Sequence, residues 1–320
     1  MSAGLWRRAQ RADVPALCAF LAARERTCAG FSGRLLREEA GGLRVLRLPS
    51  ALRGGVWIRE AQEGSGKPGG KLSGALLCHP SGLAFPVFSE ADDPARQGPD
   101  SGLGGLARAI SILQASRAWR PASVAGAARD VDRLEAAARL EPVVKVGYVS
   151  MSLEPPAAAR LAAAGDARAD RAFRVRRAVA SDLDALMPLQ EAYEREEVLT
   201  PIHEFNEAAC RAALARGLEL QLMYVAEETG PRGGSRIVAK AGTNARGLGV
   251  DQIGGVFTVP ERRGRGAGLA LMEALLGEIG AAGRGASLFV KPGNAAALAL
   301  YRRLGFAETG AYRADYLLEG

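Results

Sequence analysis

The sequence contains few of the residues that bind metals or form disulfides. Its 320 residues include four cysteines and two histidines, and no cysteines are arranged as Cys-x-x-Cys. The cysteines are scattered, at Cys18, Cys28, Cys78 and Cys210. Metal sites usually need closely spaced Cys and His ligands, so we predict no metal site and reduced thiols.

Long apolar segments are also missing. No run approaches the ~20 residues that a membrane-spanning helix needs, and the N-terminal residues do not follow the pattern of a signal peptide. The sequence therefore predicts a cytoplasmic protein with no membrane partner. A hydrophobic content of 48% with 24% charged residues is typical of a globular protein, and the length favours two domains.

Basic residues exceed acidic ones by seven, but their distribution argues against nucleic acid as a partner. Residues 1–155 carry 21 basic and 15 acidic side chains, whereas residues 156–320 carry 21 and 20. The arginines are spread along the chain and are not interleaved with aromatic residues, as they are in proteins that bind single strands. We interpret them as a solvated surface.

The chain contains an internal repeat. Residues 7–26 and 176–195 share nine identities in twenty positions, which predicts two copies of one architecture. Between the copies, residues 155–172 are rich in alanine and proline and are interpreted as a linker. The expected domains are therefore residues 1–154 and 173–320.

Hydrophobic periodicity predicts an α/β fold in both halves. In the first half, strands are expected at 42–48, 56–60, 72–78, 83–88 and 143–151, and helices at 102–118 and 130–140. In the second half, strands are expected at 173–179, 218–227, 237–244, 250–259 and 286–290, and helices at 182–198, 205–216, 269–279 and 294–305.

A glycine-rich loop follows one of these strands. The β-type run Ile253–Val259 ends at Pro260, and a helix follows from Leu269. Glycines in such a loop let the main chain approach a bulky anion, and free N–H groups at a helix start can bind its phosphates. Alone, this pattern is more often only a turn.

A second motif lies further along the chain. The strand Ala286–Val290 leads to Asn294, a good N-cap for a helix that carries Tyr301 and ends at Gly305. Tyr301 lies seven residues, or two turns, after Asn294, so the amide and the phenol share one helix face.

Together the two motifs resemble those of the GNAT acyltransferase superfamily over about the last 150 residues. They are Arg263-Gly-x-Gly-x-Gly268 and Asn294-x-x-Ala-x-x-Leu-Tyr301-x-x-x-Gly-Phe306. With the repeat, the resemblance implies two tandem GNAT-like domains, each a mixed, mostly antiparallel twisted sheet flanked by helices. It also implies an acetyl-CoA-dependent N-acetyltransferase that acts on a primary amine by direct transfer.

The resemblance further implies roles for individual residues. The backbone of Val256, Phe257 and Thr258 would hold the pantetheine arm and the acetyl carbonyl. Asn294 would contact the cofactor, and Tyr301 would contact it and act as the general acid. The pyrophosphate would be held by Arg263, Gly264, Arg265, Gly266, Ala267, Gly268 and Leu269. Acyl transfer needs these parts, because an oxyanion must be stabilised and a thiolate must be protonated.

The acceptor side is suggested by charged residues. Glu194 and Glu197 end the first helix of the second half, a region that lines the acceptor pocket in GNAT enzymes, and carboxylates there would suit a cationic amine. A solvated helix face with paired charges is the alternative. His203 is a further candidate for the substrate site or for a base, and an exposed loop histidine is its alternative.

The general base remains open. Asp251 or Gln252 lies near where some relatives carry a base on a strand. Another branch places a glutamate where this chain has Phe289, which leaves a water-mediated proton path. Lys240 could serve an acidic group of the substrate, although alternation along a half-exposed strand explains its position nearly as well.

The first half departs from the GNAT pattern. In place of the glycine loop it has Glu90–Ala95, whose carboxylates and proline would repel a pyrophosphate. The glycine cluster Gly102–Gly105 lacks a basic residue, and the helix from Asp130 has neither the Asn nor the Tyr. We therefore hypothesise a degenerate first copy and one bound CoA per chain. The glycine-rich loop Gly64–Gly70 is interpreted as a turn.

Two other functions compete with acetyl transfer. One is a CoA-binding sensor or scaffold without turnover. The other is a tandem transferase that takes an aminoacyl group from tRNA, which would need a basic groove and would not need the loop from Gly264 to Gly268. The sequence predicts neither the identity of the acceptor nor the oligomeric state.

Overall fold

The computed structural model describes residues 6–38, 44–46, 55–60, 71–89, 110, 119–155, 157–158, 173–229 and 234–318. Contacts divide the chain into two compact units, residues 1–149 with 310–320 and residues 150–309. This division assigns the C-terminal residues to the first unit, whereas the sequence groups them with the second half. The expected helix 102–118, Glu90–Ala95, Gly64–Gly70 and most of the linker lie outside the described residues. Within the described residues, no helix is long and apolar enough to cross a membrane.

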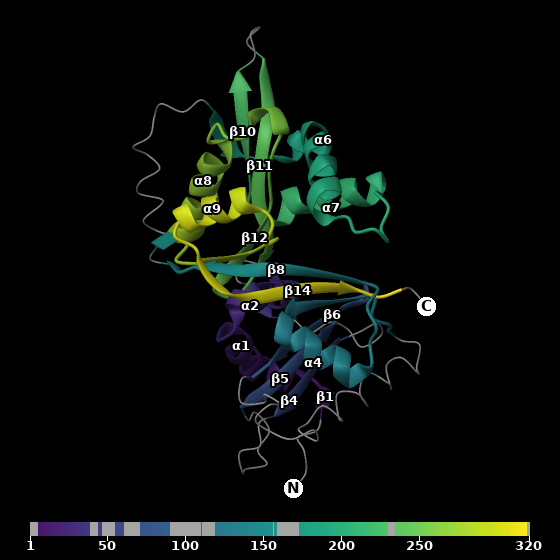
Figure 1. The fold of residues 1–320 in the computed structure, drawn as a ribbon. Coiled ribbons are helices and arrows are strands. Elements are labelled where there is room, and N and C mark those ends of the chain that lie inside the picture. Colours follow the sequence, from purple (N-terminus) through teal and green to yellow (C-terminus); the bar gives the residue numbers. More distant parts are fainter. Residues whose placement is uncertain are drawn as a thin grey trace. The chain divides into compact units, whose positions relative to one another are not determined.

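The first unit is a mixed sheet with helices on both faces (Figure 1). Its strands β1, β4, β5, β6, β7 and β14 lie in that order, and only β6 and β7 run parallel. These strands are Trp6–Arg8, Gly55–Glu60, Leu72–Cys78, Leu83–Phe88, Ser123–Ala127 and Ala307–Tyr316. The helices are α1 (Val14–Ala22), α2 (Glu25–Leu35) and α4 (Ala128–Ala138), and a small separate sheet pairs β2 (Leu36–Glu38) with β3 (Arg44–Leu46).

Side-chain alternation along β6 explains why both faces are covered. Phe88 points to one face, where its ring centroid lies 5.9 Å from that of Trp6 and where Leu134 of α4 joins the same core. Phe85, three residues earlier, points to the other face and packs at 5.8 Å from Phe31 of α2. Successive side chains of a strand face opposite ways, so each face of β6 needs a helix to bury it.

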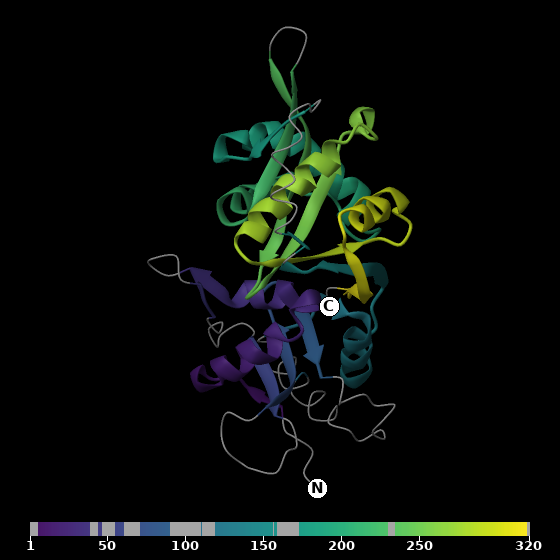
Figure 2. The same ribbon diagram turned by 90° about the vertical axis from the view of Figure 1, so that its left-hand side faces the viewer.

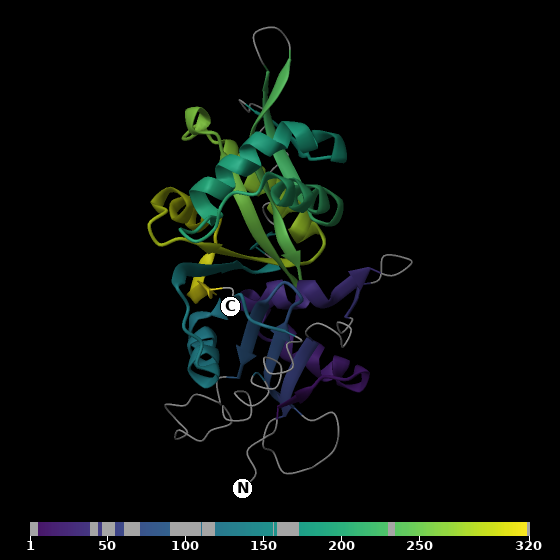
Figure 3. The ribbon, with the colours of Figure 1, turned by 90° about the vertical axis from the view of Figure 1, so that its right-hand side faces the viewer.

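The second unit repeats this plan. The strands β13, β12, β11, β10 and β9 lie in that order, and only β12 and β13 run parallel. They are Gly285–Val290, Val250–Thr258, Ser235–Arg246, Met223–Thr229 and Arg174–Arg177. The helices are α6 (Leu183–Tyr193), α7 (Glu207–Leu220), α8 (Ala267–Ala281) and α9 (Ala295–Arg303). Figure 2 shows α8 on one face of the sheet, and Figure 3 shows α6 and α7 on the other.

Two expected elements differ in the second unit. The helix expected at 182–198 is α6 followed by a π-helical turn, Glu194–Val198. The strand expected at 218–227 starts only at Met223, because Leu218–Leu220 complete α7. A short apolar run does not distinguish a buried helix end from a strand. The α/β fold with a mixed sheet and flanking helices is confirmed.

An ion triad occurs once in each unit and confirms the repeat. Arg7 donates to both oxygens of Asp13, at 2.7 Å each, and to Glu60 at 2.7 Å. The same bonds join Arg176 to Asp182, at 2.7 and 2.8 Å, and to Glu227 at 2.8 Å. Hydrogen bonds from the arginine lower the pKa of Asp13, and those from the second arginine lower the pKa of Asp182. Each triad connects the first strand of a copy to the turn that starts its first helix.

The last strand of each copy lies in the sheet of the other copy. β8 (Val144–Leu153) follows α4, and β14 follows α9, so the two strands hold equivalent places in the repeat. Residues 312–316 of β14 pair with residues 127–123 of β7 in the first unit. Residues 150–153 of β8 belong to the second unit, where β8 neighbours β13.

Candidate active site

The parallel strands β12 and β13 separate along their length. Their pairing runs from Val250 with Gly285 to Ile253 with Leu288 and ends there. β12 continues to Thr258, so the edge of Gly254–Thr258 that faces β13 keeps main-chain groups without a strand partner. Buried backbone groups need partners, and an extended ligand can supply them.

A β-bulge shapes this open edge. Lys240 and Gly242 of β11 pair with Phe257 and Gly254 of β12, so two residues of β12 oppose one residue of β11. Gly255, inside the bulge, has φ +63°, a left-handed conformation that glycine adopts without strain. Bulges re-aim the backbone and are frequent next to active sites.

The start of α8 lies beside the open edge. Gly264 and Gly266 have φ values of +73° and +87°, and a Cβ at either position would meet nothing within 4 Å. Among the described residues no side chain caps the helix, so the N–H groups of its first turn have no partner within the helix. A Cβ at Gly268 would contact Leu300 of α9 at 3.6 Å and Thr258 of β12 at 3.9 Å. The glycine loop, the end of β12 and α9 therefore lie close together.

The arginines of the loop have different roles. Arg263 donates to the Thr258 carbonyl at 3.0 Å and to Glu196 at 2.7 Å, so it holds the turn closed. Arg262 is paired with Glu228, with one hydrogen bond of 2.8 Å. Arg265 is exposed and forms no hydrogen bond or ion pair within the described residues. Its charge is available to an anion at the helix start.

Tyr301 and Asn294 occupy α9 as the sequence predicts. Tyr301 is 7% exposed and packs on Phe306 at 5.9 Å. Burial raises the pKa of its phenol, and the nearby Tyr193 and Glu197 raise it further. The Asn294 side chain accepts from the Ala297 N–H at 3.1 Å as the N-cap and donates to Glu197 at 3.1 Å. Asn294 therefore has a structural role independent of any ligand.

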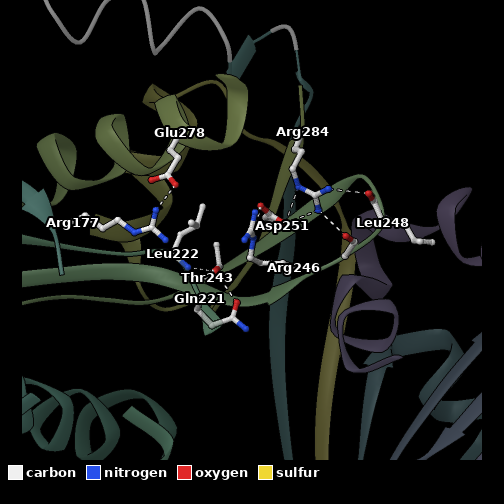
Figure 4. Close-up of polar contacts among 10 residues, drawn as sticks. Arg177, Gln221, Leu222, Thr243, Arg246, Leu248, Asp251, Glu278 and Arg284 are labelled. Carbon is white, nitrogen blue, oxygen red and sulfur yellow. Dashed lines mark hydrogen bonds and ion pairs between the residues drawn. The ribbon is translucent and has the colours of Figure 1, made fainter. Parts of the chain in front are cut away.

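Asp251 lies away from these groups. It starts β12, five residues before Val256, which is about 16 Å along an extended strand. Arg284 donates to its carboxylate at 2.6 and 3.1 Å and to the carbonyls of Gly247 and Leu248 at 2.7 and 2.9 Å (Figure 4). The side chain of Asp251 is fully buried in this clamp. The structure does not bring Asp251 together with Tyr301.

The glutamates at the end of α6 are held by neighbours. Glu194 accepts from Gln190 at 3.0 Å, and Glu197 is bonded by Asn294 and paired with Lys291 at 3.4 Å. His203 is exposed and shares a 2.7 Å hydrogen bond with Thr200. None of the three predicted substrate residues lines the cavity described next.

A cavity of about 350 Å³ opens between α6, α7 and the strands β10–β12. Its polar lining comes from both helices and from β11: Gln190, Tyr193, Arg216, Gln221, Lys240, Thr243 and Asn244. Gly254 and Gly255 of the bulge also line it. The cavity therefore reaches the strand segment where β12 leaves β13. Within the described residues, no group of three His, Cys, Asp or Glu side chains could hold a metal ion.

The sequence did not identify the bulge or Tyr193, and it left the role of Lys240 open between an acidic substrate group and strand alternation. A bulge depends on register between strands, which no local pattern reveals. One feature of the sequence does mark Lys240: it is the single charged residue in the strand segment Ile237–Asn244.

In the first unit the parallel strands β6 and β7 separate in the same way, but a side chain fills the gap between them. β6 and β7 pair only at Leu83 with Ser123 and Ala84 with Val124. The buried carboxylate of Asp130 then accepts the N–H of Phe88 at 3.2 Å. Burial raises the pKa of Asp130 to about 6. The Asp130 side chain therefore binds a main-chain N–H group of β6, whereas the corresponding edge of β12 is open.

The helix after β7 also lacks the groups of α9. Ala127 stands at the N-cap of α4, and Leu134 is buried seven residues later, where α9 has Asn294 and Tyr301. α4 therefore has neither the amide nor the phenol that α9 carries at these places.

Comparison with known proteins identifies the fold of both units. Residues 183–306 match the sequence model of the acetyltransferase (GNAT) family. A solved structure of a Drosophila protein is 13% identical with a TM-score of 0.61, covering 98% of this chain and 99% of that one. A GCN5-related N-acetyltransferase from Sphaerobacter thermophilus is 20% identical with a TM-score of 0.54, covering 98% and 95%.

A tandem GNAT protein from the clavulanic acid biosynthesis pathway is similar along its whole length. It is 14% identical with a TM-score of 0.52 and covers 99% of each chain. At these identities the similarity concerns the fold alone. No curated protein sequence matches the chain significantly.

Proposed function

We propose that this protein is an acetyl-CoA-dependent N-acetyltransferase, because residues 183–306 match the acetyltransferase (GNAT) family, which supports acyl transfer as the class of chemistry. The second unit would transfer the acetyl group of acetyl-CoA directly to a primary amine. The first unit would not bind the cofactor, because Asp130 and Leu134 occupy the equivalent places.

The open edge of β12 carries this proposal. Gly254–Thr258 has main-chain groups without a partner on β13, next to a helix start whose N–H groups are uncapped. The edge suits the amides of a pantetheine arm, and the helix start suits a pyrophosphate. Gly264 and Gly266 leave room for that anion, and Arg265 adds a positive charge.

The residues around the open edge could support each step of a direct transfer. The amine nitrogen forms the new C–N bond, the C–S bond breaks, and the amine loses one proton. Main-chain N–H groups at the bulge would stabilise the oxyanion. Tyr301 would protonate the departing sulfur and recover a proton from the amine through water. Its raised pKa keeps the phenol protonated at neutral pH, as a general acid must be.

Calorimetric titration of acetyl-CoA tests the binding part. We expect one site per chain, and no heat or two equal sites would contradict the proposal. Gly266→Asp should weaken binding by about 100-fold or more, because a carboxylate within a few ångströms repels a phosphate strongly.

Gly283→Asp is the matched control for this variant. Gly283 also has a positive φ, of +68°, and open space around it, but it follows the other end of α8. The Gly283→Asp variant should bind acetyl-CoA as tightly as the unchanged protein does. Thioester consumption with a panel of primary amines then separates an enzyme from a CoA-binding scaffold.

A further inference from the structure

Lys240 is a buried cation inside the acceptor-side cavity. It lies opposite Val225 and Phe257 in the strand register, so its side chain points to the face covered by α6 and α7. The residue is 2% exposed and lines the cavity. A buried lysine is costly unless an anion or several hydrogen bonds compensate for its lost hydration.

The protein provides only part of that compensation. The Lys240 ammonium donates to the Gly255 carbonyl at 3.0 Å and lies 4.6 Å from the centre of the Tyr193 ring. An ammonium has three N–H donors, and within the described residues the third has no acceptor. Lys240 forms no ion pair with any described carboxylate, unlike Lys145 and Lys291.

Among the described residues, the acidic groups that affect the pKa of Lys240 form no ion pair with it. Glu194 raises the pKa of Lys240 from a distance and accepts a hydrogen bond from Gln190 at 3.0 Å. Cys210 is a neutral thiol, because burial raises its pKa to about 12. Burial lowers the pKa of Lys240 to about 8, so about nine-tenths of it is charged at pH 7.

The remaining lining of the cavity is also suited to an anion. Among the described residues that line the cavity, Arg216 is the other charged one, and it is exposed. None of these described lining residues is an aspartate or a glutamate. A ligand that carries only a positive charge would meet two cations, whereas a carboxylate would neutralise one of them.

We propose that the acceptor is a small amino acid and that Lys240 binds its carboxylate. This inference rests on the proposed acetyl transfer, because it names the substrate class of the same site. The cavity volume of about 350 Å³ is at the lower end for small-molecule sites. Lys240 touches Gly255 in the bulge, so the carboxylate must lie within a few bonds of the reacting amine, as in α- and β-amino acids.

Pairs of amino acids and their amides test the proposal. The twenty standard amino acids, β-alanine and the corresponding carboxamides are compared as acceptors by thioester consumption. An amide has the same size as its acid, and its less basic amine is more often in the reactive free form. A preference for the acid therefore reports on the carboxylate.

We expect the best acid to exceed its amide in kcat/KM by about 10- to 100-fold, mostly through KM, as for a hydrogen bond between charged groups. Lys240→Met keeps the length of the side chain and removes its charge. It should abolish the preference, because kcat/KM falls further for the acid, which loses its ion pair, than for the amide. Lys71→Met, at an exposed residue, is the control and should keep the preference.

Three results would overturn the inference. They are an amide that reacts as well as its acid, turnover only with amines that lack a carboxylate, and equal losses for acid and amide in Lys240→Met. The last result would make Lys240 a base or a structural residue, and thermal unfolding of the variant separates these two. No turnover with any amine, despite binding of acetyl-CoA, would contradict the proposed function instead.

Discussion

The phenol of Tyr301 is suited to protonate a thiolate because it is buried, neutral and free of hydrogen-bond partners within the described residues of its unit. Tyr301→Phe removes the proton and keeps the ring on Phe306. We expect kcat to fall by about 100-fold, in the range of general acid catalysis, with an unchanged dissociation constant for acetyl-CoA. Steady-state kinetics and calorimetry measure the two quantities.

Tyr224→Phe is the control for this experiment. The Tyr224 hydroxyl donates to Glu278 at 2.7 Å, on β10 and away from the open strand edge. This variant should retain full kcat. A Tyr301→Phe enzyme as fast as the unchanged one would remove the phenol from the mechanism.

Lys240 should also make stability depend on pH. The pKa of Lys240 is about 8 in the folded protein, compared with an ordinary value of 10.5. Between pH 8 and 10.5, Lys240 is therefore protonated more often in the unfolded chain than in the folded protein. The free energy of unfolding therefore rises with pH through this window, by on the order of 3 kcal/mol in total.

The difference between the unchanged protein and Lys240→Met isolates this effect from other titrating groups. Urea unfolding followed by circular dichroism at pH 7 to 10.5 should show the unchanged protein gaining stability relative to the variant. Lys71→Met controls for the loss of a surface charge. A difference that does not vary with pH would mean that Lys240 titrates normally.

The turn that leads into β12 is held by an ion pair, and this pair explains Asp251 without a catalytic role. Asp251→Ala would leave Arg284, with a side chain only 15% exposed, unpaired beside two carbonyls. Breaking a buried pair in this way costs about 3 kcal/mol or more. We expect that loss in urea unfolding, with kcat within a fewfold of its original value.

The exposed pair of Asp184 and Arg211 provides the comparison. The Asp184 side chain is 83% exposed, so Asp184→Ala should cost less than about 1 kcal/mol. If Asp251→Ala lowered kcat by about 100-fold and left stability unchanged, Asp251 would be the base after all.

The elements that carry the site were predictable, but their irregularities were not. The glycine loop, the N-cap at Asn294 and the position of Tyr301 follow from local residue chemistry, and α8, α9, β12 and β13 match the expected ranges to within about two residues. The bulge at Gly255 and the end of the β12–β13 pairing depend on how strands align. Such alignment is a tertiary property, which single-sequence patterns do not contain.

The acceptor side was the least predictable part for the same reason. The glutamates of residues 191–197 form a charged cluster in the sequence, which suggested a substrate site. In the structure, each of them forms an ion pair or a hydrogen bond within the unit. The sequence could not decide between the two interpretations of Lys240, because a strand position does not reveal which helix covers it. The burial of Lys240 on the face that α6 and α7 cover favours a role in the site.

The two copies share their frame and differ at the proposed site. The ion triad occurs in both units with nearly identical distances. The strand opening also occurs in both, but Asp130 fills it in the first unit. Among the described residues, the groups proposed for acyl transfer occur together in the second unit.

The exchange of terminal strands could not be read from the repeat. Main-chain hydrogen bonds do not depend on the side chains, so either terminal strand can satisfy a neighbouring sheet edge. Exchange makes the two copies interdependent, because residues at the end of the second copy complete the sheet of the first.

Tyr312 allows this dependence to be measured. It is 8% exposed, and its ring lies 6.4 Å from Phe85 and 6.3 Å from Tyr148, inside the first unit. Tyr312→Ala should lower the free energy of unfolding by about 3 kcal/mol, as for other large buried aromatic residues. The three tryptophans, Trp6, Trp57 and Trp119, all belong to the first unit, so their fluorescence follows its unfolding in urea.

Leu318→Ala changes the same terminal segment at a residue that is 69% exposed, and it should leave the tryptophan transition within about 0.5 kcal/mol of its original position. Calorimetry at low urea should show that Tyr312→Ala still binds acetyl-CoA, because the Tyr312 ring packs on Phe85 and Tyr148 of the first unit. A tryptophan transition unaffected by Tyr312→Ala would show that β14 does not stabilise the first unit, and the strand exchange would then be absent from the protein in solution.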